Sequence, residues 1–382
     1  MRAITLHLGK EKQTLRRHPW VLPRAVDRVE GSGDVACVRA ADGRFIAWGW
    51  YDERAHTPVR LLSWDESAEP DSAWVAGTVR AAVARRGPTP PDEAVRLVFG
   101  EADGLPGVAA DRYADTVIVQ LGTKAAIDRR AAIATALLDA TGARRLRAVT
   151  DPVVGPRDRL ERVDEWIAGE PPEGPVEFVE GNLRFAADLT TGQKTGFYLD
   201  QRTNREIVGK AVGKGLLLDA FSYSGGFACA ATDAEAVCVD SAEAAGPLVA
   251  RNAALNRAGG RVSFTRADVF DYLRTTTERF DAIVLDPPKM ARGERDVPAA
   301  LRAYKDLVLH ALGRLQPAGL LFVFSCAAAI GWQELSTACA WGALDARREI
   351  RSIGWLSQSG DHPVLSSFPD SHYLRGIVWR AD

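Results

Sequence analysis

The sequence lacks several features that mark particular classes of protein. No apolar run approaches the roughly eighteen residues that a membrane-spanning helix needs, and Met1–His7 is not the continuous apolar stretch of a signal peptide. The five cysteines are odd in number and show no paired spacing, which argues against a disulfide framework and a zinc site. We therefore expect a cytoplasmic protein that has no membrane partner and binds no metal.

The chain also lacks a general excess of positive charge, because its formal net charge is −2. Charge is nevertheless uneven: residues 1–24 contain Arg2, Lys10, Lys12, Arg16, Arg17 and Arg24 but only one acid, Glu11. Such a segment can follow a phosphate backbone, and it can equally be a solvated basic arm. Charge alone does not choose between these two interpretations.

The length of 382 residues exceeds one typical core and predicts two or three domains. Residues 1–72 alternate short β-like runs with Gly and Asp turns, which indicates a small β-barrel or sandwich. Residues 73–175 combine helices near 73–86 and 125–140 with strands at 95–99 and 117–121, as in an α+β domain. The stretch 169–175, rich in Pro, Glu and Gly, predicts a linker.

A different pattern occupies residues 176–382. A hairpin at 176–179 and 183–187 is followed by strands that alternate with helices such as 242–256 and 299–315. This alternation predicts a mainly parallel sheet with helices on both faces, a doubly wound α/β fold. Its seven expected strands are 216–220, 236–240, 262–267, 281–286, 320–325, 349–355 and 373–379.

Asp286-Pro287-Pro288-Lys289 follows one of these buried strands directly. The prolines end the strand because neither can donate a hydrogen bond to a neighbouring strand. Ligands of open α/β sheets bind at the carboxyl ends of the strands. The tetrapeptide therefore marks the expected rim of an active site.

The end of the first strand predicts a cofactor loop. Gly225 and Gly226 allow a tight turn and close approach of a ligand to the backbone. Asp240 ends the next strand at a spacing suited to ribose hydroxyls, and Asp268-Val269-Phe270 ends the third, where it could bracket an adenine ring. Each acid singly could instead be a helix cap. The closely spaced glycines of a pyrophosphate site are absent, which favours S-adenosylmethionine over NAD or FAD.

Cys326 is the second chemical candidate, because it comes one residue after the buried strand 320–325, at the same sheet edge as Asp286. A thiol at this place suits nucleophilic catalysis. We interpret Cys37, Cys229, Cys238 and Cys339 as small core residues, since they lie within strand or helix patterns.

The chain resembles, over nearly its whole length, the PUA-domain RNA methyltransferases that make 5-methylcytosine in large-subunit ribosomal RNA. The matching stretches, in the order of the family, are residues 17–21, 101–107, 192–202, 221–227, 286–289, 325–326 and 361–364. One departure stands beside the cysteine: the family usually reads Ser-Cys-Ser, whereas this chain has Ser325-Cys326-Ala327.

The resemblance implies a multidomain α/β protein. A PUA RNA-binding domain would occupy residues 1–72, a central α+β domain 73–175, and a seven-stranded, Rossmann-like class I methyltransferase domain 176–382. It implies that S-adenosylmethionine contacts Phe221, Ser222, Tyr223, Gly225, Gly226, Phe227, Asp240, Ser241, Asp268, Val269, Asp286 and Gln201. RNA contacts are expected from Lys194, Arg202, Lys289, Arg17 and Trp20, and a homodimer is also implied.

The expected reaction begins when the Cys326 thiolate adds to C6 of a cytosine and so makes C5 nucleophilic. Asp286 would bind the N3/N4 edge of the base and stabilise the adduct. Two alternatives stay open. One is methylation of a ring nitrogen, such as guanine N7, with no covalent step; the other is a non-catalytic RNA-binding or ribosome-assembly factor.

Overall fold

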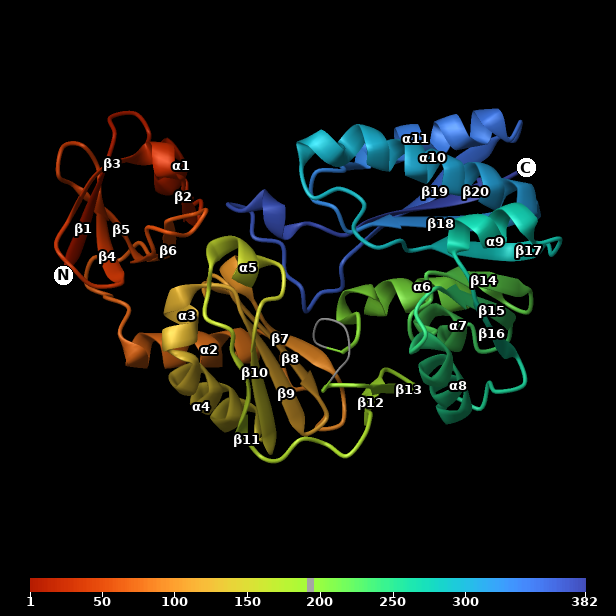
Figure 1. The fold of residues 1–382 in the computed structure, drawn as a ribbon, viewed down its shortest axis with the longest axis horizontal. Coiled ribbons are helices and arrows are strands. Elements are labelled where there is room, and N and C mark those ends of the chain that lie inside the picture. Colours follow the sequence, from red (N-terminus) through yellow and green to blue (C-terminus); the bar gives the residue numbers. More distant parts are fainter. Residues whose placement is uncertain (191–195) are drawn as a thin grey trace. The chain divides into compact units, whose positions relative to one another are not determined.

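The computed structural model describes residues 1–190 and 196–382, and the chain forms two compact units (Figure 1). The first unit comprises Met1–Phe178, Asp188–Gly196 and Asp361–Ser371. The second comprises Val179–Ala187, Phe197–Gly360 and His372–Asp382. No helix in the described part of the chain is long and apolar enough to cross a membrane.

The first unit begins with a six-stranded sheet of order β2-β6-β5-β4-β1-β3. Its apolar core includes Ile4, Leu6, Val38 and Leu61, which confirms the expected small β-fold at the N-terminus. The strands are β1 (Arg2–Leu6), β2 (Trp20–Val21), β3 (Val26–Glu30), β4 (Val35–Arg39), β5 (Phe45–Tyr51) and β6 (Val59–Ser63), with helix α1 (Lys12–Leu15) between β1 and β2.

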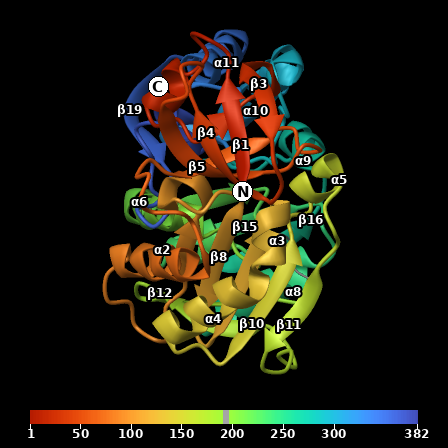
Figure 2. The same ribbon diagram turned by 90° about the vertical axis from the view of Figure 1, so that its left-hand side faces the viewer.

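A five-stranded sheet of order β11-β10-β9-β8-β7 completes the first unit, and helices α2 and α4 pack against each other beside it (Figure 2). Its elements are α2 (Ser72–Arg85), β7 (Val95–Phe99), β8 (Val108–Tyr113), β9 (Thr116–Leu121), α3 (Lys124–Asp128), α4 (Arg130–Thr141), β10 (Arg145–Thr150), α5 (Val154–Asp158) and β11 (Asp164–Ala168). The single helix predicted at 125–140 is wrong in one respect. It breaks at Arg129, whose N–H bonds Ala126 O at 3.2 Å in a tighter turn.

The second unit is built on a seven-stranded sheet of order β16-β15-β14-β17-β18-β20-β19. The first five strands in this order run parallel, whereas β20 is antiparallel to both β18 and β19. The hairpin strands β12 (Val176–Glu180) and β13 (Leu183–Ala187) pair separately. The sheet strands are β14 (Leu216–Ala220), β15 (Glu235–Asp240), β16 (Val262–Arg266), β17 (Phe280–Leu285), β18 (Leu315–Ser325), β19 (Ile350–Ser357) and β20 (Arg375–Ala381).

Helices cover both faces of this sheet, as Figure 1 shows. Because side chains alternate along a strand, β17 contributes Ile283 and Leu285 to the core on one face and Ala282 and Val284 to the core on the other. Helices α9 (Val269–Thr275), α10 (Val297–Arg314) and α11 (Trp332–Asp345) share the first core, and α6 (Arg202–Val212), α7 (Gly226–Ala230) and α8 (Ala245–Leu255) the second. The predicted doubly wound sheet is confirmed.

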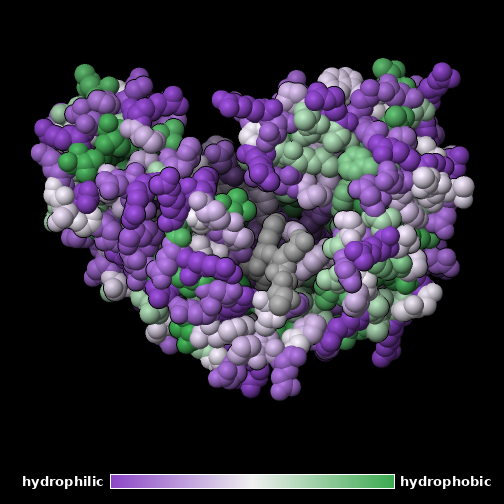
Figure 3. Space-filling view, viewed as in Figure 1, coloured by the Kyte–Doolittle hydropathy of each residue, from purple (hydrophilic) through white to green (hydrophobic). Residues whose placement is uncertain are grey.

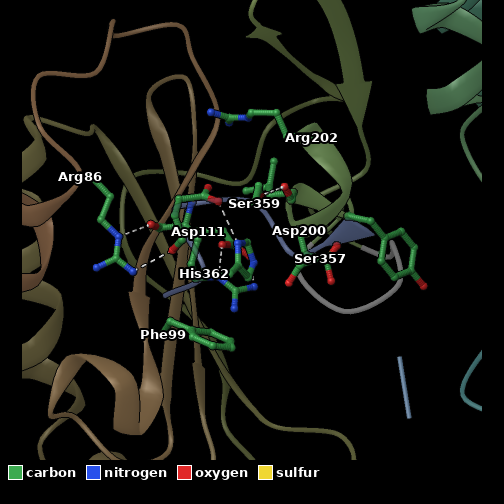
Figure 4. Close-up of polar contacts among 12 residues, drawn as sticks. Arg86, Phe99, Asp111, Asp200, Arg202, Ser357, Ser359 and His362 are labelled. Carbon is green, nitrogen blue, oxygen red and sulfur yellow. Dashed lines mark hydrogen bonds and ion pairs between the residues drawn. The ribbon is translucent and has the colours of Figure 1, made fainter. Parts of the chain in front are cut away.

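Residues Asp361–Ser371 lie between β19 and β20 in the sequence but belong to the first unit, and we call them the strap. Asp361 accepts hydrogen bonds from Arg96 N at 2.9 Å and from Arg86 Nη2 at 2.8 Å. The buried His362 ring packs on Phe99 with centroids 5.3 Å apart (Figure 4). The chain thus leaves the second unit after β19, becomes part of the first, and returns to form β20.

Hydrophilic residues cover most of the face shown in Figure 3, with smaller hydrophobic areas among them. The large apolar side chains that are exposed in the second unit include Trp341, Leu344, Ile353 and Trp355. They lie on α11 and on β19, which is an edge strand.

Candidate active site

The sheet order places the candidate site at a topological switch point. From β14 the chain proceeds outward to β15 and β16, and then returns to β17 on the other side of β14. Ala220 at the end of β14 pairs with Val239 of β15 and with Leu285 of β17. The residues that follow, Phe221, Asp240 and Asp286, therefore emerge side by side at the edge where α/β sheets bind ligands.

The loop after β14 has an unusual backbone. Phe221 and Tyr223 adopt positive φ angles of 64° and 47°, which side chains other than glycine rarely adopt, and Gly225 follows with φ 73°. Strained backbone of this kind clusters at ligand sites. The loop is tied to β15 by Ser222 N, which donates to Val239 O at 3.1 Å. Gly226 and Phe227 were also predicted to contact the cofactor, but both are part of the core. Gly226 is buried, and the Phe227 ring stacks on the Phe324 ring with centroids 5.6 Å apart.

Asp240 holds this loop in place through both oxygens. Its Oδ2 accepts from Tyr223 N at 2.9 Å and its Oδ1 from Ala242 N at 2.8 Å. A carboxylate has about four acceptor positions, so these bonds leave capacity for ribose hydroxyls. Ser241, the next residue, is exposed.

Asp268 is a helix cap, the alternative that the sequence left open for each acid. Its Oδ1 accepts from Phe270 N at 2.8 Å and from Asp271 N at 3.2 Å at the start of α9. Val269 is buried in the core, whereas the Phe270 ring meets Phe221 edge to face with centroids 6.3 Å apart. These hydrogen bonds show only that Asp268 caps α9, so its expected contact with the adenine ring stays a prediction.

Asp219, at the end of β14, was not among the expected site residues. Its side chain is buried and accepts from Ala228 N at 3.1 Å. Burial, together with the nearby Asp286 and Asp240 charges, raises the pKa of Asp219 to about 8. A carboxyl group that holds its proton near neutral pH thus lies beneath the loop.

Asp286 and Cys326 lie near the same two tyrosines. Burial raises the pKa of Tyr304, on α10, and negative charge on Cys326 or Asp286 raises it further. Burial likewise raises the pKa of Tyr198, with Asp286 and Cys326 among the contributing charges. The structure therefore gathers the thiol and the carboxyl group that the sequence predicted at one sheet edge.

Cys326 differs from the other cysteines in its accessibility. It is half-buried, whereas Cys37, Cys229, Cys238 and Cys339 are all buried. Burial raises the pKa of both Cys229 and Cys339 to about 12, and it raises the pKa of Cys37 and Cys238 as well. Ala327, which replaces the usual serine of the family, is fully buried in the core on that face of the sheet.

The segment before α6 brings Gln201 to Asp286. Gln201 Nε2 donates to Asp286 Oδ2 at 3.0 Å. The turn is anchored to the end of β19, since Ser359 N donates to Asp200 O at 2.9 Å (Figure 4). Arg202 Nε lies 3.7 Å from Glu180 Oε2. Lys194 lies outside the residues that the structure describes.

The other expected RNA contacts occupy different surroundings. Lys289 is exposed after the two prolines. Arg17 is exposed, with its guanidinium 5.8 Å from the centre of the Trp64 ring, and Trp20 donates from Nε1 to Glu101 at 2.7 Å. Both belong to the first unit. Their contacts with RNA stay predictions.

Sequence reasoning also missed Tyr198, Asn204 and Tyr304. Tyr198 lies inside the segment 192–202 that carries the family resemblance, so a signal for it existed. Asn204 and Tyr304 are ordinary helix residues in the sequence, and only the fold brings them to the site.

The described site suits an organic cofactor. The Ser222 side chain is buried in the loop after β14, next to the Cys238 thiol. Asp240 keeps acceptor capacity beyond its two backbone hydrogen bonds. In residues 1–190 and 196–382, no group of three or more His, Cys, Asp or Glu side chains could hold a metal ion.

Comparison with known families identifies two regions. Residues 100–356 match the family described as S-adenosylmethionine-dependent methyltransferase, and residues 4–64 match the PUA-like domain. The ribosomal RNA large subunit methyltransferase I of Aeromonas salmonicida is 35% identical over 391 aligned residues, which cover 99% of each chain. Its namesake from Erwinia tasmaniensis is 33% identical and covers 99% of this chain and 98% of its own.

Solved structures share the whole fold. The methyltransferase SMU.776, solved in complex with SAH, superimposes with a TM-score of 0.86 over 100% of both chains at 20% identity. A SAM-dependent methyltransferase from Streptococcus mutans superimposes with a TM-score of 0.85, also over 100% of both chains, at 19% identity.

Proposed function

Since the chain belongs to the family of S-adenosylmethionine-dependent methyltransferases that includes the ribosomal RNA large subunit methyltransferases I, we propose that it methylates C5 of a cytosine in large-subunit ribosomal RNA through a covalent Cys326 adduct. The observation that carries this proposal is the half-buried Cys326 thiol, which lies with Asp286 at the cofactor edge of the sheet. Methylation of a ring nitrogen has no use for a nucleophile there.

The cofactor supplies an electrophilic methyl group on a sulfonium. Cytosine C5 is a poor nucleophile, so the Cys326 thiolate first adds to C6 and shifts electron density to C5. C5 then takes the methyl group, a base removes the C5 proton, and the C6–S bond breaks to restore the thiolate and the aromatic ring. The target base must leave its stack to reach such a site.

Asp286 would bind the N3/N4 edge of the cytosine and stabilise the adduct. Asp240 would hold the cofactor ribose, and the loop 221–225 with Ser222 would hold the amino-acid part. Lys289, Arg202, Lys194, Arg17 and Trp20 are proposed to contact RNA. The domain boundaries and the homodimer implied by the resemblance also stay predictions.

The test is transfer of labelled methyl to ribosomal RNA purified from a strain that lacks this protein, followed by mapping of the modified base. We expect 5-methylcytosine at one position in the wild type. Cys326→Ala should abolish transfer while SAH binding, measured by calorimetry, stays within about threefold of wild type. Cys37→Ala provides a matched control, since this thiol is buried in the first unit.

Three outcomes would overturn parts of the proposal. Full activity of Cys326→Ala would exclude the covalent step. A labelled purine would replace cytosine C5 with nitrogen methylation. RNA binding without any methyl transfer would make the protein a non-catalytic factor.

A further inference from the structure

We propose that Asn252 is a positioning residue for the cofactor: its side chain holds the main-chain oxygen of Ser224 and thereby fixes the loop 221–225 that follows β14. The inference rests on the proposed role of this loop in holding the cofactor. It extends that role to helix α8 and to the hairpin of β12 and β13, which supply none of the expected site residues.

Asn252 links the hairpin to the loop. Its Oδ1 accepts a hydrogen bond from Ala186 N, on β13, at 2.7 Å, and its Nδ2 donates to Ser224 O at 3.0 Å. Asn252 is 0% exposed, so water does not compete for these bonds. Helix α8 packs beside β13, as Figure 1 shows. One side-chain amide thus joins two segments that are far apart in the sequence.

Both of these partners are main-chain groups, and this fixes the direction of the Asn252 amide. An N–H group can only donate and a carbonyl oxygen can only accept, so Oδ1 must face Ala186 and the NH₂ group must face Ser224. Main-chain groups do not titrate near neutral pH. The arrangement therefore does not depend on the protonation state of any side chain.

The loop needs support because its backbone is strained. Phe221 and Tyr223 have positive φ angles, and such strain persists only where the surroundings fix the backbone. Strand β15 holds N–H groups of the loop through Val239 O at 3.1 Å and Asp240 Oδ2 at 2.9 Å. Asn252 instead holds a carbonyl oxygen. Both kinds of main-chain group in the loop are therefore fixed from outside it.

Helix α8 supports the loop at a second point as well. A Cβ atom at Gly225 would lie 3.3 Å from both γ-carbons of Val249, so the loop backbone lies directly against this buried side chain. Val249 and Asn252 are three positions apart and share one face of the helix. That face makes an apolar contact with the loop, and the hydrogen bond from Asn252 sets the direction of the Ser224 carbonyl group.

The decisive experiment compares Asn252→Leu with Asn256→Leu, because leucine resembles asparagine in shape but forms no side-chain hydrogen bond. Asn256 lies at the end of α8 and bonds the main-chain N and O of Arg184, in the same hairpin. Within the described part of the chain, none of its hydrogen bonds reaches the loop 221–225. It is therefore the matched control.

SAH affinity, measured by calorimetry, reports the position of the loop. For Asn252→Leu we expect Kd to rise about fivefold or more, since a buried hydrogen bond that holds the loop is lost. For Asn256→Leu we expect Kd to stay within about twofold of wild type. Asn252→Ala provides a second variant that needs no repacking and favours the helix, and it should weaken binding as Asn252→Leu does.

Enzyme kinetics separate lost positioning from lost folded protein. Unfolded molecules lower the number of binding sites and kcat, but they leave Kd and KM of the folded molecules unchanged. We therefore expect the Asn252 variants to raise KM for S-adenosylmethionine, while kcat at saturating cofactor stays within about threefold of wild type. A lower kcat with an unchanged KM and Kd would overturn the inference and leave Asn252 a folding role.

Hydrogen exchange followed by mass spectrometry tests the loop without any ligand. Peptides that contain residues 222–225 should exchange faster in both Asn252 variants and at the wild-type rate in Asn256→Leu. Unchanged exchange in the Asn252 variants, or equal effects of Asn256→Leu on exchange and on SAH affinity, would overturn the inference.

Failure of the proposed function gives different results. Faster exchange together with unchanged SAH affinity would refute the cofactor role of the loop, on which the inference rests. Methyl transfer to a base other than cytosine C5 would refute the proposed reaction. That outcome changes neither the SAH affinities nor the exchange rates, which would still decide the role of Asn252.

Discussion

Phe368 packs against Trp20 with ring centroids 4.7 Å apart, and the two rings come from opposite ends of the chain. Phe368 also meets the His18 ring at 5.5 Å, while the Arg60 guanidinium lies 5.2 Å from the centre of the Trp20 ring. The strap thus completes the apolar contacts of the segment that carries the predicted RNA-binding residues.

Replacing Phe368 by alanine should destabilise the first unit by about 3 kcal/mol, since a buried aromatic ring is lost. Chemical denaturation monitored by Trp fluorescence measures this free energy of unfolding. Val364→Ala in the same strap should change it by less than about 0.5 kcal/mol, because Val364 is half exposed. Equal effects of the two substitutions would contradict a structural role for the ring.

Asp219 should make the stability of the second unit depend on pH. Its pKa is about 8 in the folded state and about 4 in the unfolded state, so between these pH values the folded chain keeps a proton that the unfolded chain has lost. Stability is therefore lost as pH rises across that interval, by at most about 1.4 kcal/mol per pH unit.

The matched variant is Asp219→Asn, whose oxygen can still accept from Ala228 N. Melting temperatures from pH 5 to 9 should show the wild type falling behind this variant up to about pH 8, with no further divergence above it. A constant difference across the whole range would show that Asp219 is ionised in the folded protein.

Asp268→Asn separates the capping role of this residue from cofactor binding. Asparagine caps a helix as well as aspartate does, so the free energy of unfolding should stay within about 0.5 kcal/mol of wild type. If Asp268 also binds the cofactor, SAH affinity measured by calorimetry should fall roughly tenfold, since one charged acceptor is lost. An unchanged affinity would assign Asp268 to the helix alone.

Alkylation should distinguish Cys326 from the other thiols. Brief treatment with iodoacetamide near neutral pH should modify Cys326 first, because it is the half-buried cysteine and the other four are buried. Peptide mass spectrometry identifies the adduct, and methyl transfer should decline in step with it. Modification of Cys37 at the same rate would refute this selectivity.

The strands β14, β15 and β17 were predictable because each is a short, mainly apolar run, whereas β18 extends over 11 residues and begins at Leu315, before its predicted start at residue 320. Predicted and observed bounds agree at β14, and they differ by one residue at β17. Sequence alone could also place Asp286 and Cys326 at one edge, since strand direction decides that. The hydrogen bond from Asn204 to the main-chain oxygen of Ser357 was not predictable, because these residues meet only through the pairing of β19 with β20 and the packing of α6.

The strap also escaped prediction. Nothing local in residues 361–371 shows that they leave their own sheet, and their partners Arg96, Phe99 and Trp20 precede them by hundreds of positions. The break at Arg129 escaped for a similar reason. Its guanidinium pairs with Asp34, which directly precedes β4, a contact that no helical periodicity encodes.

The strap determines when the protein can become whole during its synthesis. Domains commonly fold in order as the chain emerges, the N-terminal one first. Here the first unit lacks Asp361–Ser371 until the chain has been made as far as Ser371, and the second unit lacks β20 until after that. A nascent chain that stalls before Asp361 can therefore complete neither unit.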